Sequence, residues 1–421
     1  MRAGLALTIS AFGQSLVEPE RVAAMRQAFE AAVSAPRLRC QISPVRPALS
    51  FGFRFQNGYT IDTPLAQFLG SGHGLTVHTR VTAEGREPVY LTQTEALPAV
   101  PETKLEVETA GTFVVGEGKY GLEVLVEDDL HRFCRGAWQI QARRTGSERQ
   151  LKPTTPPGAV EELSAGGPLL PDPKSPRLDF SSKRIARLTI LVHAAPLSPN
   201  LSQLQPTDVQ RLVDSLSSLL RELPAQKTRL IAFNLDQRAV IFRTEGFEAN
   251  QMDELTAALN HLELGLVDYR TLRERPEPID LLLGLVQAEL RDPKPPDALI
   301  VLGPRTRMLD DVPAVAVGKR PAVGPPIFGL QYRFNRPLVP GQGPYSGGSL
   351  GPVPSRPGPL RAGGERLPGK LQPPAAVDTI ERLVSRLKGQ TIPIRTPHDL
   401  ADAIQIMNSR ILIVNSIPPR N

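Results

Sequence analysis

A histidine at the end of an apolar stretch is the first side chain that could do chemistry. The stretch LTILVHAAPLSPN, residues 188–200, begins with the apolar residues of a buried strand and ends in a loop of small residues and prolines. His193 is its only ionisable residue, and imidazole is the side chain most often used as a general base. No nucleophile paired with an orienting carboxylate is visible near it. We therefore expect a core or rim histidine rather than a catalytic base, and no catalytic residue is assigned.

Arginines gather in two further loops, 268–278 and 303–311, which are expected to follow strands of the same domain. They are Arg270, Arg273, Arg275, Arg305 and Arg307. The guanidinium group can hold a carboxylate with two parallel hydrogen bonds, so this rim could receive an acidic partner. The same loops contain five acids, namely Asp268, Glu274, Glu277, Asp310 and Asp311. Pairing of these acids with the arginines on a solvated rim is the alternative, and the even balance of charge favours it.

A glycine-rich segment could be mistaken for a nucleotide site. GEGKYG, residues 116–121, matches the GxGxxG pattern, but a dinucleotide fingerprint needs a strand before it and a helix after it. Alternating apolar residues on both sides predict strands here. The pattern therefore indicates a hairpin turn.

The cysteine count limits metal and redox chemistry. Cys40 and Cys134 are the only two cysteines, and zinc sites use clustered pairs of ligands. The two either form a disulfide in an oxidising compartment or remain two buried thiols.

Composition excludes several classes of protein. The chain has 421 residues with a net charge of +6, and it shows no basic run interleaved with aromatic residues, so nucleic-acid binding is not expected. No stretch approaches the roughly 20 apolar residues that cross a membrane. The 43 prolines and 34 glycines indicate linkers and insertions rather than one compact body.

The N-terminus has the pattern of a short signal peptide. Arg2 precedes a short apolar run, and small residues at Ala11 and Gly13 suit cleavage before Gln14. Residues 1–13 are therefore predicted to be a signal peptide and the protein to be secreted or periplasmic. An ordinary, poorly ordered N-terminus is the alternative.

The elements that must position these side chains divide the chain into two domains. A helical pattern within 14–36 precedes short alternating strands over 37–144, which predict an antiparallel β-sandwich of immunoglobulin-like size. Residues 145–183 have the composition of a Pro/Gly-rich linker. Strands and helices then alternate over 184–412, which predicts a doubly wound, mostly parallel sheet and so an α/β domain. A disordered insertion is expected at 336–375, and the remaining predicted segment is a C-terminal tail at 413–421.

The order of elements in 184–412 resembles a von Willebrand factor type A domain. A strand, a long helix, the hairpin LIAFNLDQRAVIF and two helices are followed by ALIVLG, FGLQY, a helix, and a closing strand and helix. The segment RLKGQTIPIRTPHDLADAI is similar to the usual end of such domains. With its leading β-domain, the chain resembles exported bacterial proteins that carry a VWFA-related acidobacterial domain.

The resemblance implies where a cation site would lie. Such domains hold a cation through a D-x-S-x-S motif after the first strand, a later threonine, and an aspartate after the fourth strand. His193, Ala195 and Leu197 stand at the first three positions, and Gly303 or Pro304 stands at the last. Only Thr271 retains an oxygen, and one hydroxyl cannot hold Mg²⁺. The resemblance therefore implies a degenerate site with neither metal nor cofactor.

These observations lead to one expected function and two alternatives. We expect an exported, non-catalytic protein–protein interaction or envelope-associated scaffold protein, whose protein partner the sequence does not name. The alternatives are an envelope-directed hydrolase with an unrecognised site and a metal-dependent adhesin.

Overall fold

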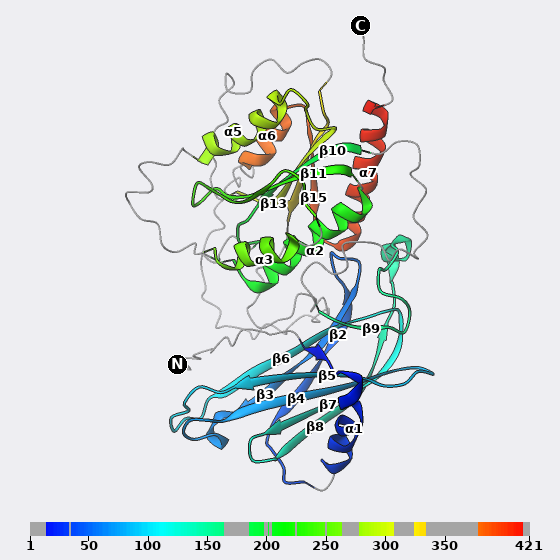
Figure 1. Cartoon of the computed structure of the whole chain (residues 1–421), viewed down its shortest axis with the longest axis vertical. Coiled ribbons are helices and arrows are strands. Elements are labelled where there is room, and N and C mark those ends of the chain that lie inside the picture. The colour runs from blue at the N-terminus through cyan, green and yellow to red at the C-terminus, as the bar shows by residue number, and fades with distance from the viewer. Residues whose placement is uncertain are drawn as a thin grey trace, which may run out of the picture.

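The computed structural model describes two bodies of secondary structure, a β-sandwich and an α/β domain (Figure 1). The described residues are 14–32, 35–163, 185–197, 201, 204–223, 225–248, 251–262, 278–306, 324–333 and 378–415. The predicted signal peptide and the predicted insertion at 336–375 lie outside them.

The sandwich consists of two antiparallel sheets. One has the strand order β1-β5-β4-β7-β8 and the other β2-β3-β6-β9. The strands of the first are β1 (Ser15–Leu16), β5 (Val89–Ala96), β4 (Gly74–Ala83), β7 (Gly118–Asp128) and β8 (Phe133–Ala142). Those of the second are β2 (Gln41–Leu49), β3 (Phe55–Pro64), β6 (Glu106–Val115) and β9 (Val160–Glu162). The short helix η2 (Leu65–Gln67) follows β3.

Alternation along the strands produces the core between the two sheets. Every second residue of a strand points to the same face, and the inward sets of β4 and β6, such as Val77, Val81 and Phe113, are fully buried in one cluster. On the outer face, Phe29 of helix α1 (Val22–Ala31) packs against Tyr90 with ring centroids 6.0 Å apart.

Three segments of the first domain differ from the prediction. The helix expected within 14–36 is shorter, because residues 15–16 pair with β5 and η1 (Pro19–Arg21) precedes α1. Part of the linker expected over 145–183 has regular structure, since η3 (Gly146–Gln150) is followed by β9, which pairs with β6. Composition missed β9 because a three-residue strand acquires its structure from its neighbour. The GEGKYG segment is no hairpin turn, because β6 and β7 belong to different sheets.

The α/β domain is built on one sheet with the order β12-β11-β10-β13-β14-β15. Its strands are β10 (Ile185–His193), β11 (Ala225–Asn234), β12 (Ala239–Thr244), β13 (Ala298–Pro304), β14 (Ile327–Tyr332) and β15 (Gln390–Ile394). All its pairings are parallel except that of β12 with β11 at one edge. The predicted mostly parallel sheet and the antiparallel β-domain before it are thus confirmed.

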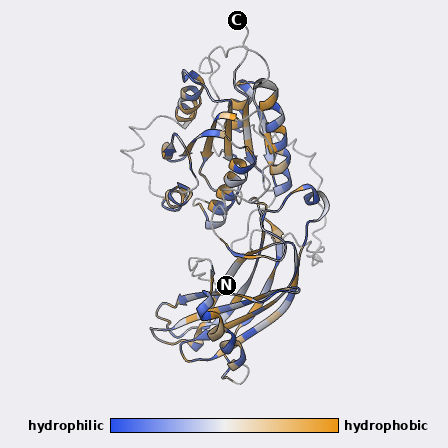
Figure 2. Ribbon diagram, turned by 45° about the vertical axis from the view of Figure 1, so that its right-hand side comes forward, coloured by the Kyte–Doolittle hydropathy of each residue, from blue (hydrophilic) through white to orange (hydrophobic). Residues whose placement is uncertain are grey.

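Helices cover both faces of this sheet. Apolar residues of α2 (Pro206–Glu222), α3 (Met252–Asn260) and α7 (Pro397–Asn415) join one buried cluster, and those of α5 (Pro278–Arg291) and α6 (Thr379–Arg386) join another. Apolar residues concentrate on the central strands, as Figure 2 shows, which is expected of strands buried on both faces. Helix α7 runs past the predicted domain end at 412 into the expected tail, whose residues 416–421 lie outside the described part.

Candidate functional site at the carboxyl edge of the parallel sheet

The strand order places a switch point between β10 and β13. Numbered in chain order, the strands of this sheet run 3-2-1-4-5-6, so the chain leaves the two central strands in opposite directions. In open α/β sheets, ligands bind at the carboxyl ends of the strands beside such a point. His193 ends β10, and Gly303 and Pro304 end β13, so these residues stand where a ligand would be expected.

The imidazole of His193 fills this position. Its residue is only 2% exposed, and its ring stacks on Phe233 of β11 with centroids 5.3 Å apart. A Cβ atom added at Gly303 would lie 2.6 Å from the Cβ of His193, so the neighbouring strand must have glycine here to make room. Within the described part of the chain, neither ring nitrogen has a hydrogen-bond partner.

Burial decides the charge of this histidine. Removal from water disfavours the imidazolium form and lowers the pKa of His193 to about 4, although the carboxylates of Asp236 and Asp378 and the Pro304 carbonyl act in the opposite direction. The ring is therefore neutral at ordinary pH. The sequence left open whether His193 belongs to the core or to the rim, and its exposed fraction of 2% places it in the core.

In the loop after β10, the two other residues at predicted cation-site positions are buried. Ala195 and Leu197 are each 6% exposed, and Leu197 donates its backbone N–H to the Asp208 carboxylate at 3.4 Å. Asp208 also accepts the backbone N–H of Gln205 at 3.3 Å. Asp208 Oδ2, at the start of α2, thus holds the loop through two backbone donors, whereas Asp208 Oδ1 has no hydrogen-bond partner among the described residues.

A threonine–aspartate pair that the sequence did not point to lies at the same edge. The Thr306 hydroxyl donates to Asp378 Oδ2 at 2.7 Å, its backbone N–H donates to the same oxygen, and Asp378 Oδ1 accepts the Glu381 N–H at 3.1 Å. Asp378 is the N-cap of α6. Its spacing to Glu381 is a capping signal that could have located it. What could not be foreseen is that the same carboxylate also ties the end of β13.

The chemistry available at this edge is limited. The described residues contain no group of three or more His, Cys, Asp or Glu side chains placed to hold a metal ion. Thr306 and Asp378 contact each other rather than His193, so they form no nucleophile–base relay. Among the described residues of this edge, none is hydrogen-bonded to the ring of His193.

Little of the predicted arginine rim can be placed. Arg305 is exposed directly after β13, whereas the other rim arginines and Thr271 lie outside the described residues. The structure therefore describes five of the ten predicted edge positions, namely His193, Ala195, Leu197, Gly303 and Arg305.

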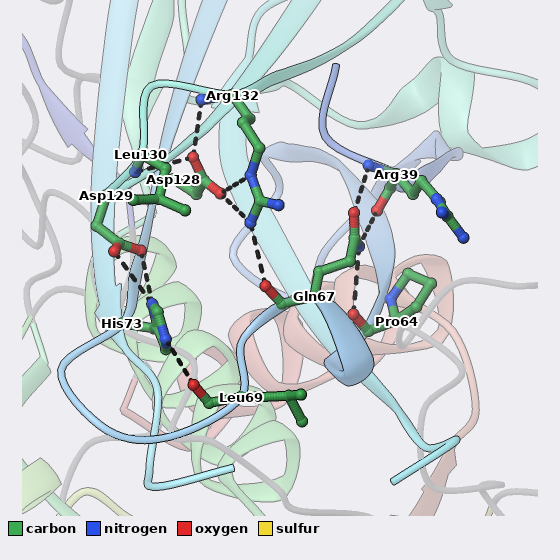
Figure 3. A network of polar contacts seen from close by, with 9 residues as sticks. All are labelled: Arg39, Pro64, Gln67, Leu69, His73, Asp128, Asp129, Leu130 and Arg132. Carbon is green, nitrogen blue, oxygen red and sulfur yellow. Dashed lines mark hydrogen bonds and ion pairs between the residues drawn. The ribbon is translucent and has the colours of Figure 1, made fainter. Parts of the chain in front are cut away.

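A second polar cluster closes the end of the sandwich (Figure 3). His73 lies between the Asp129 carboxylate, 3.1 Å from its Nδ1, and the Leu69 carbonyl, 3.2 Å from its Nε2. Asp128 accepts from the Arg132 side chain at 2.6 Å. The hydrogen bond to Asp129 raises the pKa of His73. Since these groups satisfy one another across two loops, the cluster is a structural tie.

The two cysteines are joined in a disulfide. Cys40 precedes β2 and Cys134 lies in β8, with Cα atoms 6.0 Å apart. Of the two alternatives for these residues, the bridge is the one observed. Among the described helices, none combines the length and apolar character needed to cross a membrane.

Comparison with known proteins found structural likenesses only. No family model and no curated protein matches the chain. A conserved hypothetical protein, BatB from Bacteroides thetaiotaomicron, aligns with 14% identity over 54% of this chain and 99% of its own, with a TM-score of 0.32. A superoxide reductase (neelaredoxin) from Ignicoccus hospitalis aligns with 15% identity over 30% of this chain and 92% of its own, with a TM-score of 0.19. Scores this low support no inference about family or function.

Proposed function

We propose that the protein is an exported, non-catalytic interaction module whose α/β domain is of the von Willebrand A type and works without a metal ion. The strand order and the single antiparallel edge strand support this assignment. So does the placement of His193 at the end of the first strand of the sheet, with Ala195 and Leu197 in the loop after it.

The observation that carries the proposal is the filled switch point. Where a cation and its ligands would sit, a neutral imidazole packs between Phe233 and the glycine of β13. Restoring a cation there would require expelling the ring and supplying several oxygens. Binding at this edge is therefore proposed to use its exposed rim, including Arg305, and a carboxylate-bearing protein partner.

Export is part of the same proposal. The disulfide between Cys40 and Cys134 fits an oxidising compartment, since such bonds are rare where thiols are kept reduced. N-terminal sequencing of the exported protein should begin near Gln14. Recovery of the protein with intact Met1 from the cytoplasm alone would contradict this part.

Two measurements test the proposed function. Isothermal titration of the full chain with Mg²⁺, Mn²⁺ or Ca²⁺ should give no binding heat, and micromolar binding that His193→Ala abolishes would overturn the metal-free proposal. A partner captured from an envelope fraction should be lost with Arg305→Glu and retained with Arg410→Glu, a substitution of another exposed arginine, in α7. Equal loss of the partner with both variants would show that the chain attracts it by nonspecific charge and not through the rim.

A further inference from the structure

A hairpin tip of the sandwich is buried in the α/β domain. Strands β2 and β3 are joined by the tip SFGFR, residues 50–54, whose ends close on each other because the Ser50 N–H donates to the Arg54 carbonyl at 2.8 Å. Phe51 and Phe53 are 3% and 4% exposed, and Arg54 is 1% exposed. Two aromatic rings and an arginine at the end of a hairpin would normally be exposed, but here residues of the neighbouring domain contact them. The strand β2 leads towards that domain in Figure 1.

Charge complementarity joins the tip to helix α2. Arg54 Nη2 lies 3.3 Å from Asp214 Oδ1, and the Gln56 amide donates to Asp214 Oδ2 at 3.3 Å. Gln210 of α2 donates to the same carboxylate at 3.0 Å. Both charged side chains are almost completely removed from water, so each depends on the other to offset its desolvation.

The apolar half of the contact is as specific. The ring of Phe51 meets that of Tyr332 edge-on at 5.7 Å, and the Phe51 carbonyl accepts the Ser218 hydroxyl at 2.7 Å. Tyr332 is fixed in turn by donation to Ser215 Oγ at 2.6 Å. The Arg221 guanidinium lies 5.6 Å from the ring centroid of Phe53. Buried aromatic and arginine anchors of this kind carry most of the energy of protein interfaces.

The tip is strained in the conformation that makes these contacts. Phe53 has a φ of +58°, in the left-handed region that a bulky side chain adopts only at a cost of about 1 to 3 kcal/mol. In three-residue hairpin loops this position usually belongs to glycine. A phenylalanine here serves no need of the hairpin itself, whereas its ring is buried against the second domain.

The contact lies at the carboxyl-edge side of the parallel sheet. Tyr332 is the last residue of β14, and Asp214 and Ser215 lie in the middle of α2, which begins at that edge. Helix η3 of the sandwich packs against α7, which also begins there. The sandwich is thus fastened beside the edge at which open sheets bind ligands.

We propose that Asp214, Ser215, Ser218 and Tyr332 form a recognition site for an aromatic–glycine–aromatic–arginine turn, and that the SFGFR tip occupies this site in cis as a latch. The latch makes the two domains one cooperative unit and leaves the site unavailable to other chains while it is closed. Its partner in trans has the chemistry of the tip itself, so a second copy of this chain is the occupant expected when the latch opens. This proposal uses no cation and no rim partner, so it stands or falls separately from the proposed function.

Two spectroscopic probes report the two domains separately. Trp138 is the only tryptophan and lies in β8 of the sandwich, and the long helices α2, α5 and α7 lie in the α/β domain. Tryptophan fluorescence and far-ultraviolet circular dichroism should therefore give coincident urea transitions in the wild-type chain. In Asp214→Ala and in Phe53→Gly the two transitions should separate, and the second variant removes the strain and so leaves the hairpin itself intact.

A matched control distinguishes a latch from a general loss of stability. Glu289 is 2% exposed and pairs with Arg229 at 2.8 Å entirely within the α/β domain. Glu289→Ala should lower both transitions together, because the latch still couples the domains. Separate transitions in the wild type, or coincident transitions in Asp214→Ala, would overturn the proposal.

The recognition site is tested directly with the tip as a probe. A fluorescent cyclised peptide of residues 48–56, ALSFGFRFQ, should bind the full-length Arg54→Ala variant, whose own tip is released. It should bind the wild type about a hundredfold more weakly, because the tethered tip competes at high effective concentration. Binding should be lost again in Arg54→Ala combined with Asp214→Ala. Failure to bind Arg54→Ala, or equal binding to all three proteins, would refute the site.

Discussion

Replacing His193 by leucine should make the protein resistant to mild acid. Burial lowers the pKa of this histidine from its ordinary value of 6.5 to about 4. Between these two pH values the unfolded chain binds a proton at this histidine and the folded chain does not. Because the folded pKa is the lower one, stability is unaffected above the unfolded pKa and is lost as the pH falls from about 6.5 towards 4. Leucine has a similar volume and does not titrate.

The size of the effect follows from these two pKa values. Because protonation is linked to unfolding, this histidine lowers the free energy of unfolding of the wild type by about 2 kcal/mol at pH 5 and about 3 kcal/mol at pH 4, relative to pH 7. Other groups titrate in both proteins and cancel in the difference. The free energy of unfolding of His193→Leu minus that of the wild type should therefore rise by about 2 kcal/mol between pH 7 and pH 5.

Urea unfolding followed by far-ultraviolet circular dichroism measures this difference, since the long helices belong to the domain that contains His193. His131→Leu is a suitable control, because His131 is 82% exposed and Glu127 raises its pKa. Protonation strengthens the ion pair between His131 and Glu127 as the pH falls. The free energy of unfolding of His131→Leu minus that of the wild type should therefore fall, not rise, between pH 7 and pH 5. A difference between His193→Leu and the wild type that stays constant from pH 7 to pH 5 would refute a buried neutral imidazole.

Three further outcomes are expected. Gly303→Ala should cost about 1 to 3 kcal/mol by crowding the imidazole, whereas Gly284→Ala, with open space around it in α5, should gain up to about 1 kcal/mol; thermal unfolding with the opposite order would contradict this packing. Asp378→Ala should cost about 1 to 3 kcal/mol and speed hydrogen exchange at the start of α6; unchanged exchange there would contradict its capping role. Cys40→Ser with Cys134→Ser should lower sandwich stability by about 4 to 5 kcal/mol, measured by tryptophan fluorescence; an unchanged urea midpoint would contradict it.

Local sequence patterns predicted most helices and strands, but some of these elements begin or end at other residues in the structure. Thr396 directly precedes α7, and its hydroxyl oxygen accepts a hydrogen bond from the Asp399 N–H at 3.2 Å, as a polar N-cap residue does. At α2 the capping box is formed by Gln205 and Asp208, although Thr207 and Gln210 have the same spacing in the sequence. Several polar residues near a helix start can compete for the cap, and packing of the loop before the helix selects one.

The backbone at the end of α6 also differs from what the position of its glycine indicates. A glycine just after a helix favours the left-handed conformation at that position, and Gly389 follows α6, but Lys388 takes that conformation with a φ of +53°. A Cβ at Gly389 would lie 2.6 Å from the Ile327 carbonyl oxygen. Glycine is needed there for the close approach of strand β14, which the sequence does not display.

The sequence by itself determined the alternation of two kinds of element, because periodicity of two or of 3.6 residues is a local property. It also placed His193, Ala195 and Leu197 in one loop without ligand oxygens. Only the tertiary structure decided that the imidazole is buried, neutral and unpartnered, because that depends on Phe233 and Gly303 from other strands. The pairing of Arg54 with Asp214 was equally invisible, since the two lie 160 positions apart and their meeting depends on how the two domains dock.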